Sequence, residues 1–205
     1  MMKQISLLLL IFYCASCSAQ SIPFPFSDKG WEQQIKGLLP EKWHSVDRVK
    51  LYETTLDEIE DFYGKGVRFR KGGKNYSPYL QCYLVGNDYV AVFQSGPLGG
   101  WSTVTGILVA KKAVYGNDNC GGSIDLKIPL GISELKIGDD EGRVYDLLGQ
   151  PSLKTGNLLA YRYEQKGVSK VKGSDNQNIY VTSGIEVGLD KGQVSWIRVY
   201  WQEST

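Results

Sequence analysis

TLDEIEDFYG (Thr55–Gly64) and DEGRVYDLLG (Asp140–Gly149) are two stretches of one pattern. Each begins with a residue that caps helices, continues with apolar residues at helical spacing and ends at a glycine, which favours helix termination. Strand-like runs follow both stretches. The pattern predicts an α+β fold of two tandem helix-plus-antiparallel-sheet repeats. In each repeat a short helix would pack on one face of a three- to four-stranded meander.

The strand-like runs alternate between apolar and polar residues. They lie at Val67–Arg70, Tyr79–Val85, Tyr89–Ser95, Thr103–Ala110, Leu158–Glu164, Ile179–Asp190 and Gln193–Trp201. Turn residues at Gly86–Asp88 and Asp190–Gly192 favour tight hairpins between neighbouring runs. These boundaries predict a first repeat at 21–112, a linker at 113–133 and a second repeat at 134–205.

A further helix is predicted before the first repeat helix. Trp31, Ile35, Leu38 and Leu39 follow the amphipathic period, so they would share one face of a helix that begins near Ser27. Pro40 would end this helix, because proline cannot continue the helical hydrogen-bond pattern.

The first 20 residues are expected to form a signal peptide. Lys3 precedes an apolar run, Ile5–Tyr13, which is too short to span a bilayer but fits the core of an export signal. Two readings stay open: cleavage after Ala19 would release a soluble protein, whereas Cys17 could become a lipidated N-terminus. Both readings predict an exported bacterial protein that is periplasmic or anchored to the outer membrane.

Two cysteines, Cys82 and Cys120, follow the signal peptide. In an oxidising compartment two cysteines of an exported domain are expected to pair. The predicted disulfide would tie the linker to the first repeat and close a loop of about 37 residues, which stabilises a fold by ~3–4 kcal/mol in the chain-entropy model.

The composition and the reactive residues argue against several functions. The chain has 23 Lys and Arg against 22 Asp and Glu, and this balance disfavours nucleic acid as the main partner. The single histidine, His44, has no persuasive Cys or Ser partner for nucleophilic catalysis. Asn117–Gly121 hints at a calcium loop, but Pro129 stands where such a loop needs glutamate. The sequence therefore predicts no enzyme, no metal and no cofactor.

Aromatic residues are plentiful, with 13 Tyr and 5 Trp, and they mark the predicted binding face. Alternation puts the aromatic residues of the first repeat on one side of its strands and Leu80, Cys82 and Leu84 on the other. We expect the aromatic side to be free, together with one side of the last strand. Tyr, Trp and Arg dominate interface hot spots. The alternative is that these aromatics only pack against a helix or against the other repeat. The residues predicted to bind a partner are Tyr79, Tyr83, Tyr89, Phe93, Trp196, Arg198 and Tyr200.

The second repeat carries a more specific motif. Leu135–Glu141, Val144 and Leu147–Pro151 are similar to the xIxxGMxxxEVxxLLGxP helix entry of the SmpA/OmlA outer-membrane lipoprotein family, and Ile185–Val194 looks like its closing hairpin. The chain departs from the motif at Asp139, where the family has methionine. Short motifs of this kind carry architecture better than function.

Tandem use of such a unit resembles the beta-lactamase inhibitor proteins. In that fold two helix-plus-four-strand repeats form one concave sheet that binds another protein. The resemblance implies an exported, non-catalytic binder of an envelope or secreted protein, which acts as an inhibitor or immunity-type protein or as an envelope assembly factor. The alternative is a structural, small-ligand-binding or peptidoglycan-binding envelope lipoprotein. A membrane would be reached only through the lipid anchor.

Overall fold

The structure is a computed structural model that describes residues 35–70, 78–96, 103–116, 120–124, 130–166 and 180–204. The predicted signal peptide, the lipidation candidate Cys17 and the first part of the predicted N-terminal helix lie outside the described residues. No helix of the described residues is long and apolar enough to cross a membrane.

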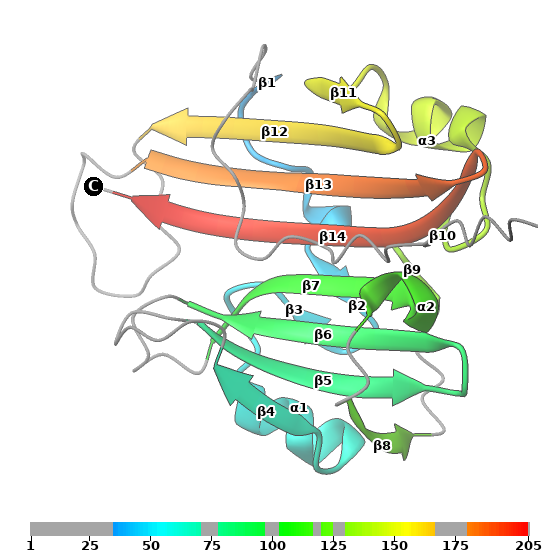
Figure 1. Ribbon diagram of the computed structural model, residues 1–205. Coiled ribbons are helices and arrows are strands. Elements are labelled where there is room, and N and C mark those ends of the chain that lie inside the picture. The colour runs from blue at the N-terminus through cyan, green and yellow to red at the C-terminus, as the bar shows by residue number, and fades with distance from the viewer. Residues whose placement is uncertain are drawn as a thin grey trace, which may run out of the picture.

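A single mixed sheet of ten strands forms the body of the molecule (Figure 1). Its strands are β1 (Ile35–Lys36), β4 (Val67–Arg70), β5 (Tyr79–Val85), β6 (Tyr89–Ser95), β7 (Val104–Lys111), β8 (Gly121–Ile124), β11 (Leu153–Thr155), β12 (Leu158–Lys166), β13 (Tyr180–Asp190) and β14 (Gln193–Ser204). Their order is β1-β12-β13-β14-β7-β6-β5-β4, with β11 beside β12 and β8 beside β5. β1 pairs with β12 in parallel, and β8 pairs with β5 in parallel. The other neighbouring strands are antiparallel.

The remaining elements are short. Two hairpins stand apart from the sheet, β2 (Ser45–Val46) with β3 (Val49–Lys50) and β9 (Gly131–Ile132) with β10 (Leu135–Lys136). The helices of the described residues are η1 (Glu41–Trp43), α1 (Leu56–Tyr63), α2 (Lys112–Tyr115) and α3 (Glu141–Leu148).

The predicted fold class, two tandem helix-plus-sheet repeats, is wrong. β14 pairs with β7 through Ile197–Val109 and Val199–Ile107, so strands from both halves of the chain belong to one sheet. The protein is mostly β, and among the described residues it has only three short α-helices. Alternation along a strand predicts which residues share a face, but it does not predict which strand lies beside it.

The predicted N-terminal helix also differs from the structure where its residues are described. Ile35–Lys36 is β1 and pairs in parallel with Tyr163 and Glu164 of β12. Gly37 follows with a φ of 109°, which is outside the helical region. Pairing with the edge of β12 replaces the helical hydrogen bonds that the periodicity had suggested.

Both predicted repeat helices begin and end as expected. Thr55 Oγ1 accepts a hydrogen bond from the backbone N–H of Glu58 at 3.2 Å, and the Glu58 carboxylate accepts one from the backbone N–H of Thr55 at 2.7 Å. The two bonds together form a capping box. At α3, Asp140 Oδ1 accepts from the backbone N–H of Arg143 at 2.8 Å. α1 ends at Gly64, which has a φ of 78°.

The two faces of the sheet differ in what covers them. The face that we call the helix face packs against α1, α3 and the β9–β10 hairpin in the larger core, which includes Leu56, Ile59 and Val144. The opposite face, which we call the front face, carries α2 at one end (Figure 1). Its apolar residues are Leu80, Cys82, Val90, Val92, Leu108 and Ala110, packed with Tyr115 of α2.

The predicted disulfide is confirmed. Cys82 and Cys120 are bonded, with their Cα atoms 4.9 Å apart. Cys120 immediately precedes β8, so the bond holds β8 against the second half of β5, at Tyr83–Val85. The segment predicted as a linker thereby contributes a strand to the sheet.

Candidate functional site

The structure divides the predicted partner-binding residues between the two faces. Tyr83 and Phe93 lie on the helix face and are fully buried. The ring of Tyr63 of α1 lies 6.2 Å from that of Tyr83 and 6.4 Å from that of Phe93. The aromatic side of the first half of the sheet is therefore the side that α1 covers, and the expectation that it is free was wrong.

Tyr79 and Tyr89 are half-buried and lie far from each other along the strands. Tyr79 begins β5, where the guanidinium carbon of Arg70 is 4.3 Å from the centre of its ring. Tyr89 begins β6 and pairs with Lys111. Because β5 and β6 are antiparallel, the two tyrosines lie at opposite ends of this hairpin and do not form one patch.

Trp196, Arg198 and Tyr200 do come together, on the front face of β14. We call them the Trp–Arg–Tyr row. Their partners on β13 are Gly188, Glu186 and Gly184, in that order. A Cβ atom at Gly188 would stand 1.8 Å from Trp196 Nε1, and one at Gly184 would stand 2.5 Å from the hydroxyl oxygen of Tyr200. The two aromatic side chains therefore occupy the space above glycines, and Glu186 lies between them.

Glu186 and Arg198 form an ion pair at the middle of this row. Arg198 is 1% exposed and Glu186 is 5% exposed, and the guanidinium carbon lies 5.9 Å from the centre of the Trp196 ring. Burial raises the pKa of Glu186, and the attraction of Arg198 offsets this effect only in part. A buried pair of this kind is weak evidence for stability, because the cost of removing both charges from water competes with their attraction.

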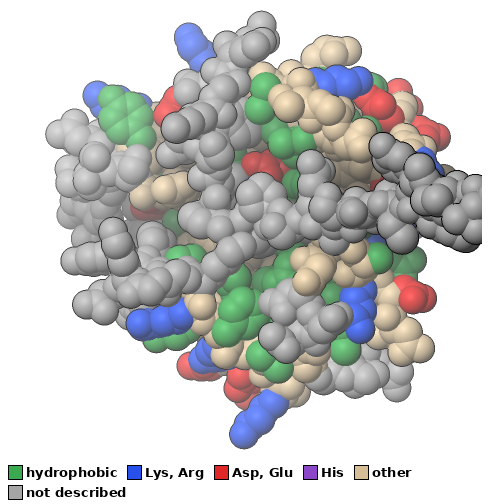
Figure 2. All heavy atoms as spheres, in the orientation of Figure 1, with side chains coloured by type: hydrophobic (Ala, Val, Ile, Leu, Met, Phe, Trp, Pro, Cys, Tyr) green, Lys and Arg blue, Asp and Glu red, His purple; other side chains and the backbone are tan. Residues whose placement is uncertain are grey.

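The surroundings of the row are apolar. Arg198 pairs with Leu108 of β7, and Trp196 pairs with Ala110. Figure 2 shows this side of the molecule, and most of the Lys, Arg, Asp and Glu side chains that it colours lie towards the rim.

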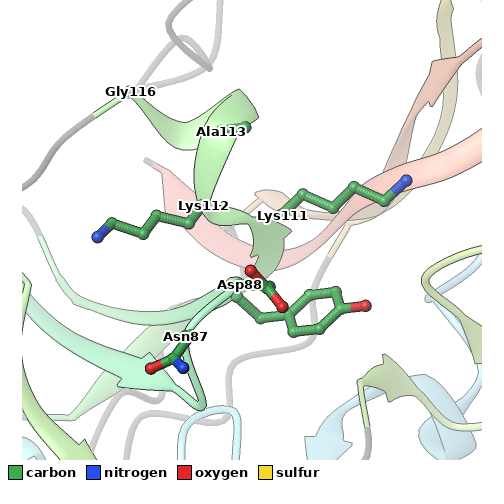
Figure 3. A pocket seen from close by; sticks show the side chains of 7 residues that line it. Asn87, Asp88, Lys111, Lys112, Ala113 and Gly116 are labelled. Carbon is green, nitrogen blue, oxygen red and sulfur yellow. The ribbon is translucent and has the colours of Figure 1, made fainter.

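A surface pocket of about 580 Å³ lies beside α2 and the β5–β6 turn. It is lined by Asn87, Asp88, Tyr89, Lys111, Lys112, Ala113 and Gly116. Its volume suits a small ligand, but such sites are mostly apolar. The side chains of Lys111 and Lys112 point in opposite directions (Figure 3), so their charges do not converge on one ligand.

A smaller pocket of about 370 Å³ contains His44. The ring is almost buried, and its Nε2 donates a hydrogen bond to the carbonyl oxygen of Leu39 at 2.7 Å. The ring also lies edge-on to Trp201, with 5.3 Å between the ring centres. These contacts fix the orientation of the histidine within the fold.

Comparisons with known proteins give no match to a protein-family model, to a curated protein or to a solved structure. The resemblances to SmpA/OmlA lipoproteins and to beta-lactamase inhibitor proteins therefore stay predictions. Among the described residues, no group of three or more His, Cys, Asp or Glu side chains could hold a metal ion. Residues 117–119 of the calcium-like stretch lie outside them.

Sequence reasoning missed a second surface, the outer edge of β4. The stretch Lys65–Arg70 (KGVRFR) contains three basic residues and no acidic residue. The local positive charge of this stretch could have identified the surface, but the net charge of the whole chain is close to zero and does not reveal it.

Proposed function

We propose that this chain is an exported, non-catalytic protein-binding module. Its partner is another envelope or secreted protein, and the contact is centred on the Trp–Arg–Tyr row of the front face. An inhibitor or immunity-type protein and an envelope assembly factor would both work by such binding. The Cys82–Cys120 disulfide supports export, because disulfides persist in oxidising compartments.

The observation that carries this proposal is the buried Glu186–Arg198 pair, with Trp196 and Tyr200 on either side of it. Apolar residues of similar volume are often as stable as a buried ion pair, or more stable. The pair is therefore better explained by recognition than by stability. Trp, Tyr and Arg are also the residue types that contribute most to binding energy at interfaces.

Because the Trp–Arg–Tyr row is buried, binding requires a rearrangement of the protein around it. Trp196, Arg198 and Tyr200 are 9%, 1% and 4% exposed. A partner contacts their side chains only when the residues packed around them move, so binding should change the environment of Trp196. Rearrangement at an interface is common among regulatory interactions.

The test compares wild-type mature protein with the double variant Glu186→Leu/Arg198→Met. Each tagged protein is mixed with the envelope and the medium of the producing organism, and captured proteins are identified and quantified by mass spectrometry. We expect wild type to retain one stoichiometric protein and the double variant to lose it by about tenfold or more while staying folded.

The control is Lys42→Met/Glu134→Leu, which removes an exposed ion pair of 2.9 Å without touching the front face. This variant should capture the partner as wild type does. Equal capture by the front-face variant would show that the row is not the contact, and the absence of any stoichiometric protein would contradict the binding function itself.

A further inference from the structure

β4 is the end strand of the sheet, and its outer edge is open among the described residues. β4 lies beside Tyr79–Cys82 of β5, and β8 lies beside Tyr83–Val85 of the same strand. A Cβ atom at Gly121 of β8 would stand 2.5 Å from Val67 Cγ2, so the two short strands meet without a gap. Within the described residues no strand pairs with the outer edge of β4.

An open edge can accept another strand, because alternate backbone N–H and C=O groups point outward from it. The side chains of β4 alternate between the two faces. Val67 and Phe69 pair with Cys82 and Leu80 on the front face and are half-buried. Arg68 and Arg70 point to the helix face and are exposed. This edge therefore offers an apolar side and a basic side to an added strand.

The positive charge of this edge lies mainly at Arg70. Arg68 is already paired, with its Nη2 atom 2.9 Å from Asp57 and 3.4 Å from Glu60. Arg70 stacks on Tyr79 and donates to its hydroxyl, and it forms no ion pair with an acidic residue that the structure describes. Lys65 adds a second cation just before the strand.

We propose that the outer edge of β4 binds an extended segment of a protein partner that alternates acidic and apolar residues. The segment adds to the sheet as a further strand, with its acidic side chains beside Arg70 and Arg68 and its apolar side chains beside Phe69 and Val67. Opposite charges placed across neighbouring strands stabilise their pairing.

A second copy of this chain fits the edge poorly. An antiparallel pair of β4 strands about a two-fold axis keeps front-face residues opposite front-face residues. Registers centred on residue 68, 69 or 70 place arginine opposite arginine: Arg68 against itself, Arg68 against Arg70, or Arg70 against itself. Like charges directly opposite one another destabilise a strand pair, so the charge pattern selects a different, acidic strand.

This surface is separate from the Trp–Arg–Tyr row, because β4 is four positions along the sheet from β14. The inference goes beyond the proposed function, and either one can fail without the other.

The test uses the isotope-labelled mature protein with its disulfide intact, and short peptides as probes. One peptide repeats Glu-Val, a second repeats Lys-Val, and a third is the Glu-Val peptide with every backbone nitrogen methylated, which keeps the charge but loses the backbone donors. We expect the Glu-Val peptide to cause saturable amide shifts at residues 67–70 and to bind at least about tenfold more tightly than the other two.

Arg70→Glu should weaken Glu-Val binding by about tenfold and strengthen Lys-Val binding. The matched control is Arg143→Glu on the exposed side of α3, which should leave both affinities unchanged. The proposal is overturned if the Glu-Val peptide gives no saturable shift at residues 67–70 up to about 1 mM, if the methylated peptide binds equally well, or if both variants have the same effect.

Discussion

Gly188 shows how a single residue shapes the front face. A side chain there would collide with the indole of Trp196, since a Cβ atom would lie 1.8 Å from its Nε1. We expect Gly188→Ala to displace the ring and to lower the free energy of unfolding by about 1–3 kcal/mol, as overpacking does. Urea unfolding measures this loss.

Gly106→Ala on β7 is the matched control. A Cβ atom at Gly106 would lie 3.4 Å from the Cβ of Gln94, so it needs no large rearrangement. We expect its free energy of unfolding to stay within about 0.5 kcal/mol of wild type. Equal losses in the two variants would mean that the indole does not hold the position found here.

The Glu186–Arg198 pair gives a second prediction, for which a double-mutant cycle is the measurement. Glu186→Leu leaves the buried Arg198 cation without the Glu186 carboxylate, and Arg198→Met leaves that carboxylate without its guanidinium. For each single variant we expect a loss of about 3–5 kcal/mol in the free energy of unfolding. Glu186→Leu/Arg198→Met removes both charges and should stay close to wild type. A single variant that costs less than about 1 kcal/mol would show that the pair is solvated, because exposed pairs contribute that little.

At the scale of the element, α1 depends on its capping box. Thr55→Ala removes the side-chain acceptor and should lower the free energy of unfolding by about 1 kcal/mol. Hydrogen bonds from Thr55 hold the pKa of Glu58 below its ordinary value of 4.5. The stabilisation linked to Glu58 is therefore present above the unfolded pKa and is lost as pH falls through the lower, folded pKa.

A titration followed by NMR tests this linkage. In Thr55→Ala the remaining bond from the backbone N–H keeps part of the shift, so the pKa of Glu58 should rise towards 4.5 without fully reaching it. The pKa of Glu141 is the internal control, since Lys154 and Tyr145 lower it independently of α1. If the pKa of Glu58 did not change, the Thr55 hydroxyl would not donate a hydrogen bond to the Glu58 carboxylate.

β8 is the element that depends most on a covalent bond. It has four residues and contacts β5, and the disulfide at Cys120 fixes its start. Cys82→Ser/Cys120→Ser should lower the free energy of unfolding by about 3–4 kcal/mol in the chain-entropy model. Hydrogen exchange should accelerate first at residues 121–124 and 83–85. Two titratable thiols in denatured wild-type mature protein would contradict the bond itself.

The boundaries of several elements could be predicted because their signals are local. β4, β5 and β6 begin and end at the predicted residues, and α1 lies between its predicted cap Thr55 and its predicted stop Gly64. Caps and turn residues act on the few residues beside them, so a single sequence contains the information. β1 could not be predicted in this way, because its partner on β12 is more than a hundred residues away.

At the scale of the whole molecule, the sequence predicted the sides of the strands but not what covers them. Tyr83 shows the reason. Its aromatic ring suits an interface, but its hydroxyl also donates to the carbonyl oxygen of Gly64 at 3.0 Å, which lets the side chain be buried beneath α1. Trp196 and Arg198 were predicted to share a side with Tyr200, and they do, although their burial was not predicted.

The pairing of β7 with β14 joins the two halves of the chain, and it predicts that the molecule unfolds as one unit. Five residue pairs, from Trp196–Ala110 to Tyr200–Gly106, join these strands in the middle of the sheet. The core on the helix face also contains residues of both halves, among them Ile107 and Ile197. Separating the halves would expose two central strand edges and part of this core to water.

We therefore expect residues 21–124, which keep β8 and the disulfide, and residues 125–205, expressed separately, to lack cooperative unfolding, while the mature chain unfolds in one transition. Circular dichroism during urea unfolding measures this directly, and coincident curves from tryptophan fluorescence test for a single transition. Mixing the two fragments is the control, since restored pairing of β7 with β14 should recover a cooperative transition. A sharp transition in either isolated fragment would mean that this fragment folds on its own. The β7–β14 pair would then only join two independently folded parts.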